Sequence, residues 1–349
     1  MPLARLFIPP LAACCVLSAM AGVAWAGDAN RITVLEENDS LFSKSDKHYT
    51  QGLRLSDLGS AIEPHSGLNG LFDLAGRIAP VFARDGSPPE DAATAHPRRT
   101  ALFLGQNIFT PTNLGTRPPD PSDRPYGGWL GIGASLLQDS DRHMLENLEI
   151  TIGVVGPGAF AKQVQNDFHQ FIGVPPANGW SKEIQTEPGV MLTYERLWHV
   201  PVVGGGNNGI DIVPQLGATV GNVFTYGDAG ALLRIGKNLQ ADYGPARIRP
   251  ALSGTDYFDG DHLDGKFGFY VFLGAQGRVV GRNIFLDGNS FRQSPSVDKK
   301  ALVGDLQAGL SMFWSKDWRA DVSTVHRTRE FDGQQSPDVI GTATITFSL

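Results

Sequence analysis

The chain ends in the stretch DVIGTATITFSL, residues 338–349, in which apolar and polar residues alternate. One side of the alternation holds Ala343, Ile345, Phe347 and Leu349, and the other holds Thr342, Thr344, Thr346 and Ser348. Successive side chains of a β-strand point to opposite faces, so the pattern predicts a strand with one apolar face. Such strands are typical of transmembrane β-barrels, in which lipid-facing residues alternate with lumen-facing ones.

The same period of two recurs along the chain, for example in LEITIGV at 148–154 and in FGFYVFL at 267–273. It predicts about twelve strands, near residues 31–38, 48–58, 100–108, 126–138, 144–156, 187–199, 208–221, 224–236, 266–281, 299–314, 317–330 and 338–349. An even number fits a bacterial barrel. A soluble β-sandwich also has alternating strands, but many long strands and an export signal favour an all-β transmembrane barrel.

The N-terminus predicts export. Arg5 precedes an apolar run that reaches Trp25, and the small-residue end Ala24-Trp25-Ala26 predicts a secretory signal peptide over 1–26 and a barrel domain over 27–349. A lipoprotein signal ending at Cys14 is the competing interpretation. Cys14 and Cys15 both fall within the signal, so the exported chain is expected to have no thiol, disulfide or cysteine-bound metal.

Charge and motifs exclude several classes of function. The net charge of −7 becomes about −8 once Arg5 is removed, which argues against a nucleic-acid partner. The chain has no G-x-S-x-G, H-E-x-x-H or Walker-type motif, so these serine hydrolase, zinc protease and nucleotide chemistries have no support. Nothing in the sequence points to a protein partner.

Two connections interrupt the strand pattern. Residues 59–99 form a long connection with a short helix expected near 71–81, and residues 157–173 have helical spacing. On that second helix Gln165 and His169 are four residues apart, so they share one face. A lone histidine often only forms a surface hydrogen bond, and the other seven histidines receive no special role. The aspartates at 256, 259, 261 and 264 are interpreted as a solvated turn at the periplasmic side.

The first predicted hairpin concentrates oxygen donors in ENDS at 37–40 and HYTQG at 48–52. Carboxylate, amide, hydroxyl and carbonyl oxygens are the ligands that calcium takes in proteins. If the chain begins in the periplasm, counting strands places Asn38, Asp39 and Thr50 at the same outer rim as Gln165 and His169. That rim faces the leaflet in which lipopolysaccharide resides.

These residues resemble the lipid A 3′-O-deacylase family, called the LpxR family. The resemblance rests on END at 37–39, LFSKSDKHYTQGLRLS at 41–56 and KQVQNDFHQFIG at 162–173. Further stretches follow in family order: GQNIFTPTNL at 105–114, DRPYGGWL at 123–130, GNVFTYG at 221–227 and GPARIRP at 244–250. The likeness therefore covers most of the chain after the signal.

The resemblance implies a twelve-stranded outer-membrane barrel whose site lies between the wall and an outer helix. It implies that calcium, held around Asp39 and Thr50, stabilises the oxyanion of an ester of lipid A, while His169 activates water. Gln165 would orient the base or the water, and Asn38 would donate to the oxyanion or support the metal. The family's lysine after the third strand would fall near 116–117, and its acidic residue after the histidine would fall near 175.

Two other functions stay open. A barrel phospholipase or another esterase could use a serine nucleophile activated by His169, for which Ser40, Ser43 and Ser45 are candidates at the rim. A non-catalytic barrel could serve as a channel or an anchor, and a lumen filled by side chains would disfavour a channel.

Overall fold

A single antiparallel sheet dominates the computed structural model, which describes residues 30–41, 46–82, 96–140, 143–204, 207–248, 255–260 and 263–349. The expected signal peptide, Ser43, Ser45 and Asp261 lie outside these residues. The strands are β1 Arg31–Asn38, β2 His48–Leu58, β3 Arg98–Thr110, β4 Gly127–Ser140, β5 Met144–Val155, β6 Glu187–Trp198, β7 Val200–Val203, β8 Asn208–Gly221, β9 Phe224–Lys237, β10 Phe267–Asn283, β11 Leu302–Trp314, β12 Trp318–Arg327 and β13 Asp338–Ser348.

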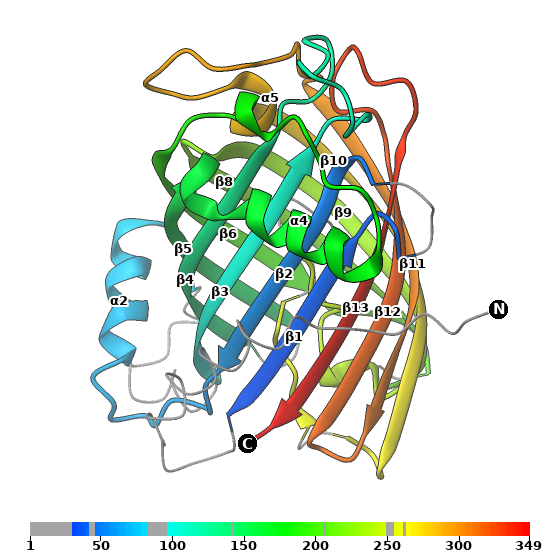
Figure 1. Ribbon diagram of the computed structural model, residues 1–349. Coiled ribbons are helices and arrows are strands. Elements are labelled where there is room, and N and C mark those ends of the chain that lie inside the picture. Colours follow the sequence, from blue (N-terminus) through cyan, green and yellow to red (C-terminus); the bar gives the residue numbers. More distant parts are fainter. Residues whose placement is uncertain are drawn as a thin grey trace, which may run out of the picture.

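The sheet closes on itself, so the predicted barrel is confirmed. The C-terminal strand β13 pairs with β1, with Phe347 opposite Ile32 and Ile345 opposite Val34. On the other side β6 pairs with β8, and the four-residue β7 pairs with β8. The barrel therefore has twelve strands, β1–β6 and β8–β13, and all twelve overlap the ranges that the alternation predicts. Figure 1 shows the wall, with β1 and β13 side by side.

Three α-helices and three 3-10 turns are described: α2 Asn69–Ile78, α4 Ala161–Ile172, α5 Ile284–Asp287, η1 Gly156–Ala159, η2 Trp180–Lys182 and η3 Leu239–Ala241. Among the described residues, no helix is both long and apolar enough to span a bilayer. We call the end of the barrel that carries α4 the α4 end. The other end, where β2 leads into α2 and where β13 stops, is the opposite end (Figure 1).

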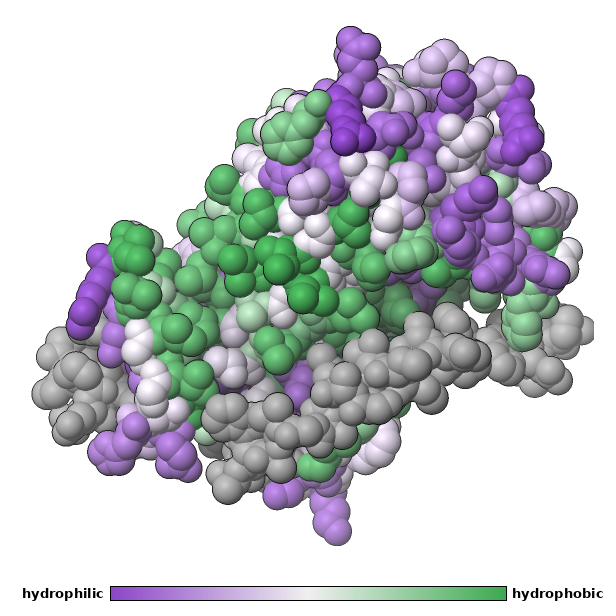
Figure 2. Space-filling view, turned by 60° about the vertical axis from the view of Figure 1, so that its left-hand side comes forward, coloured by the Kyte–Doolittle hydropathy of each residue, from purple (hydrophilic) through white to green (hydrophobic). Residues whose placement is uncertain are grey.

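The outer face of the wall is apolar in its middle. We define the apolar belt as the exposed hydrophobic residues of the strands, which include Leu102, Ile132, Ile150, Ile152, Val190, Leu192, Leu216, Leu233, Ile235, Phe269, Val271, Leu273, Leu306 and Leu310. Figure 2 shows a broad hydrophobic region beneath a hydrophilic end. Lipid-facing residues of a transmembrane barrel produce this distribution.

The inner face is polar and the lumen is filled at the opposite end. Arg234 lies 2.5 Å from Asp211 and 2.6 Å from Asp242, and Tyr243 and Tyr257 donate to Asp139 at 2.7 and 2.6 Å. A neighbouring cavity, lined by residues of β2–β5 and of the segment after β9, has a volume of only about 10 Å³.

The interpretation of the second aspartate cluster as a solvated turn is wrong for Asp256 and Asp259, which are both buried. Asp256 lies 3.1 Å from the guanidinium of Arg54, which projects from β2. A largely buried cation needs anionic partners, and Asp256 in the segment after β9 serves Arg54 beside Glu149 of β5. Asp264, by contrast, is exposed.

Candidate active site

The helix α4 packs directly against the outer face of β3 and β4. A Cβ atom at Gly128 would lie 2.5 Å from the Cβ of Ala161, so a glycine is needed for this close approach. Gln106 of β3 donates its Nε2 to the carbonyl of Ala159 at 2.7 Å. Ile108, Tyr126, Ala161, Ala177 and Trp180 form a small core between the helix and the wall. The helix is thus fixed on the outside of the barrel.

The predicted helix over 157–173 consists of two pieces. Pro157 lies in η1, and Phe160 adopts a left-handed conformation with φ of 58°, which separates η1 from α4. Gly173 ends α4 with φ of 76°, as expected for a glycine beyond a helix C-terminus. The amide of Val174 then donates to the carbonyl of His169 at 2.8 Å, which turns the chain back along the helix.

His169 is buried, and both of its ring nitrogens have partners. Nδ1 lies 2.8 Å from the carbonyl oxygen of Pro175, which can only accept, so Nδ1 carries a proton. Nε2 lies 2.9 Å from Oδ2 of Asp46. The resemblance places an acidic residue near 175, and in this chain the backbone of Pro175 holds the histidine instead.

Gln165 lies on the same helical face as His169, as the spacing predicts, and both are buried. Its Nε2 donates to Oδ1 of Asp46 at 3.3 Å, and its Oε1 accepts from Nε1 of Trp180 at 3.1 Å. One carboxylate oxygen of Asp46 therefore contacts Gln165, and the other contacts His169. Sequence reasoning missed Asp46, although it stands within the SDKHYTQG part of the resemblance, because an aspartate in a hairpin loop is usually solvated.

Asn38 and Asp39 lie in the turn that follows β1. Oδ1 of Asn38 accepts from the amide and hydroxyl of Ser40 at 2.7 and 2.5 Å, which leaves its Nδ2 as the donor group of the side chain. Oδ2 of the buried Asp39 accepts from the amide of Lys47 at 2.5 Å. Since Lys47 follows Asp46, this bond holds the two aspartates close together.

A β-bulge positions Thr50. The register between β2 and β3 shifts between Tyr49 and Gln51, and the extra residue is Thr50. Its hydroxyl lies 2.7 Å from that of Thr110, and both threonines are buried. The amide of Asp39 also approaches the carbonyl of Thr50 at 3.5 Å. The structure thus gathers Asn38, Asp39 and Thr50 at the α4 end, next to Asp46.

These side chains fit a calcium ion in kind. Asp39, Thr50 and Thr110 offer oxygen atoms only, which hard cations prefer. In the described part of the chain, no group of three or more His, Cys, Asp or Glu residues could hold a metal. A calcium ion here would therefore complete its shell with backbone, water or substrate oxygens.

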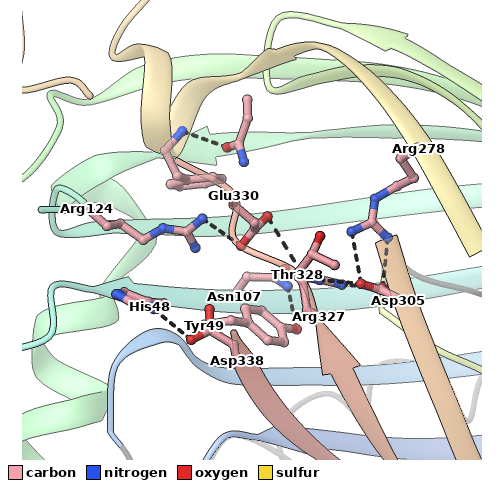
Figure 3. Close-up of polar contacts among 12 residues, drawn as sticks. His48, Tyr49, Asn107, Arg124, Arg278, Asp305, Arg327, Thr328, Glu330 and Asp338 are labelled. Atoms are coloured by element: carbon pink, nitrogen blue, oxygen red, sulfur yellow. Dashed lines mark hydrogen bonds and ion pairs between the residues drawn. The ribbon is translucent and has the colours of Figure 1, made fainter. Parts of the chain in front are cut away.

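A polar network on the lumen side supports the hairpin (Figure 3). His48, the first residue of β2, lies 2.7 Å from Asp338 and 3.5 Å from Asp123. Burial raises the pKa of Asp123, but hydrogen bonds from His48 and from the amides of Thr112 and Arg124 outweigh it and lower this pKa to about 2. His48 thus links the start of β2 to Asp338 and Asp123 on the lumen side.

The same network continues across the lumen. Arg124 lies 2.8 Å from Glu330, and Asp305 lies 2.9 Å from Arg278 and 3.0 Å from Arg327 (Figure 3). These ion pairs join the loop after β3 to strands β10–β12. The wall behind the candidate site is consequently cross-linked from its inner side.

The other candidates from the sequence are occupied elsewhere. The hydroxyl of Ser40 donates to Asn38, not to His169. Arg117, near which the family's lysine would fall, donates its Nε to the carbonyl of Asn178 at 2.6 Å. Neither residue contacts the histidine.

A closed twelve-stranded barrel with an apolar belt defines this chain as an outer-membrane β-barrel protein. The family model described as "Outer membrane protein LpxR" matches residues 11–349, so the chain belongs to the LpxR family. A comparison with curated protein sequences finds no significant match.

The barrel fold is shared with a solved structure of the same family, and two further barrels show weaker similarity. LpxR from Salmonella typhimurium is 20% identical, with a TM-score of 0.67, over 91% of this chain and 100% of that chain. The beta domain of the Bordetella autotransporter BrkA is 10% identical with a TM-score of 0.44, over 93% and 100% of the two chains. The translocator domain of NalP from Neisseria meningitidis is 10% identical with a TM-score of 0.38, over 97% and 95%.

Proposed function

We propose that this protein is a calcium-dependent hydrolase that removes the 3′-O-linked acyl or acyloxyacyl chain from lipid A. The observation that carries the proposal is the environment of His169 on a helix outside the barrel wall. Its Nδ1 is held by the carbonyl of Pro175, which leaves Nε2 as the nitrogen that can accept a proton from water. Family membership supports the choice of reaction.

Asp46 stabilises the histidine after it has taken that proton. Nδ1 faces the carbonyl oxygen of Pro175 and Nε2 faces a carboxylate oxygen of Asp46. Because both oxygens accept, both ring nitrogens donate a hydrogen bond when the ring carries two protons. At 2.9 Å there is no room for water between Nε2 and Asp46, so the carboxylate must turn aside to admit it. The Asp46 side chain is 31% exposed and has space to do so.

The other side chains hold the reacting groups. Gln165, anchored by Trp180, donates to Asp46 and so holds this carboxylate beside the histidine. The Asn38 amide would donate to the developing oxyanion. Asp39 and Thr50 would hold the calcium ion. Calcium, when bound, would polarise the ester carbonyl and stabilise negative charge on its oxygen.

The surroundings of the site support a membrane lipid as substrate. Phe160, Phe168, Phe171 and Ile172 are 39–66% exposed on and beside α4. Because α4 lies on the outside of the wall, a lipid would approach His169 from the bilayer and not through the lumen. We place the α4 end at the outer leaflet, because the proposed substrate, lipid A, resides there.

Two other functions have less support. A channel needs an open lumen, whereas the segment after β9 fills the lumen at the opposite end. A serine esterase needs a serine hydroxyl next to the histidine that acts as base, whereas the hydroxyl of Ser40, within the described residues, donates a hydrogen bond to Asn38.

The test is mass spectrometry of lipid A from cells that produce the wild type, His169→Ala or the control His143→Ala. His143 is exposed at the opposite end. We expect loss of one ester-linked acyl group with the wild type and the control only, and loss of this activity when membranes are chelated. Unchanged lipid A with folded wild-type barrel would overturn the proposal.

A further inference from the structure

The connection between β2 and β3 packs on the outside of the barrel near the opposite end. Phe72 of α2 is 1% exposed and packs with Val81 and Phe82. The same cluster includes Leu136, Leu148 and Tyr194, which belong to three adjacent wall strands, β4, β5 and β6. The helix is therefore attached to the outer face of the wall through one of its sides (Figure 1).

This connection covers charged residues that lie below the apolar belt. Glu146 of β5 is 0% exposed, accepts from the amide of Phe82 at 2.9 Å and pairs with Arg196 at 3.0 Å. Arg98 donates to Gln138 at 2.9 Å and to Asn69 of α2 at 3.2 Å. Charged groups on the lipid-facing side of a barrel are costly, and the connection shields these from lipid.

The outward side of α2 is apolar and exposed. Leu71, Leu74 and Ile78 are 48%, 54% and 77% exposed, and their spacing places them in one stripe along the helix. We call these three residues the α2 stripe. Arg77 lies off the stripe, on the polar side of the helix, and is also exposed.

The α2 stripe adjoins the apolar belt. Along β5, the next outward-facing residue after Leu148 is Ile150, which is 50% exposed. Along β6, the next after Tyr194 is Leu192, also 50% exposed. Since Leu148 and Tyr194 pack against the cluster that contains Phe72, α2 lies near the place where the lipid-facing surface of the wall ends.

We propose that α2 is an interfacial helix that inserts the α2 stripe into the adjacent leaflet of the membrane. A helix with an apolar stripe and a charged opposite side binds at the membrane interface with its apolar side among the acyl chains. The occupant of this surface is lipid, because the surface is continuous with the belt that lipid already covers. With the proposed orientation, the leaflet concerned is the inner, phospholipid one.

The test uses fluorophores attached to single cysteines in the full chain. Leu74→Cys, Ile78→Cys and the control Arg77→Cys are made in a Cys14→Ser/Cys15→Ser background, labelled with a polarity-sensitive dye and reconstituted into phosphatidylethanolamine and phosphatidylglycerol vesicles. Heat-modified gel mobility checks that each barrel is folded. We expect positions 74 and 78 to emit at shorter wavelength, to be quenched by spin-labelled lipid and to resist aqueous iodide, unlike position 77.

Iodide quenching of positions 74 and 78 equal to that of position 77, in folded protein, would overturn the proposal and point to a protein partner instead. The fluorescence measurement needs no deacylase activity. Membrane insertion of α2 can therefore be disproved while the proposed deacylase function holds, and the deacylase function can be disproved while insertion holds. Both vesicle leaflets have the same lipids, so insertion is measured independently of orientation.

Discussion

Nε2 of His169 on α4 lies 2.9 Å from Oδ2 of Asp46 in the hairpin between β1 and β2. This contact joins the helix outside the wall to the loop that also holds Asp39. Gln165 donates to the second oxygen of the same carboxylate at 3.3 Å. Asp46 is thus the group through which the base and the oxygen-rich hairpin meet.

Asp46→Asn should lower kcat at least about tenfold, with little change in KM, because the amide cannot stabilise the protonated imidazole as a carboxylate does. Asp167→Asn, on the exposed side of α4, is the control. A variant with reduced folded yield but the wild-type kcat per folded molecule would assign Asp46 a structural role only.

Asp39→Asn should raise the calcium concentration needed for half-maximal activity about tenfold or more, because calcium affinity depends on the charge of its ligands. The amide keeps the size of the side chain and its bond from Lys47, so the hairpin should stay in place. Activity is measured on chelated membranes while calcium is added back. Equal calcium dependence of wild type and variant would contradict the assignment of Asp39 as a ligand.

Gly128→Val should abolish deacylation without unfolding the barrel. The added side chain meets Ala161 at 2.5 Å, so α4 must move away from the wall and take His169 from the hairpin. Gly277→Val is the matched control, because a Cβ atom at that position has nothing within 4 Å. Heat-modified mobility reports folding, and lipid A analysis reports activity. Full activity of Gly128→Val would show that the position of α4 is not critical.

Glu183→Gln should stabilise the protein at pH 8 and have little effect at pH 4. Burial raises the pKa of Glu183 to about 7, although the charge of Lys162 acts in the opposite direction. In the unfolded chain the pKa is about 4.3, so the wild type loses stability as pH rises from about 4 through about 7. The amide variant should not show this loss. Thermal unfolding in detergent at both pH values measures it, and parallel curves for the two proteins would refute the prediction.

The barrel strands could be predicted because alternation is a local property. Residues 31–38, 48–58 and 208–221 were expected as strands and have those bounds in the structure. The short β7 was not expected, since four exposed residues hardly form a pattern. The break at Phe160 was not expected either, because a left-handed phenylalanine depends on packing and not on helical spacing.

The site was predictable only in part. Spacing alone placed Gln165 and His169 on one helical face, and strand counting placed Asn38, Asp39 and Thr50 at the same end. Asp46 and the carbonyl of Pro175 were missed, since their contacts with His169 join segments distant in sequence or use the backbone. The burial of Asp256 was not predicted, because its partner Arg54 belongs to a strand much earlier in the chain.

The sequence by itself determined the closed antiparallel wall and which residues face lipid, because each strand repeats every two residues and has one apolar side. It also determined that base and oxygen donors share one end. Only the tertiary structure decided that α4 lies outside the wall, that Asp46 meets His169, and that α2 extends the apolar belt. These depend on close contacts between distant segments, such as Gly128 against Ala161, which no local pattern encodes.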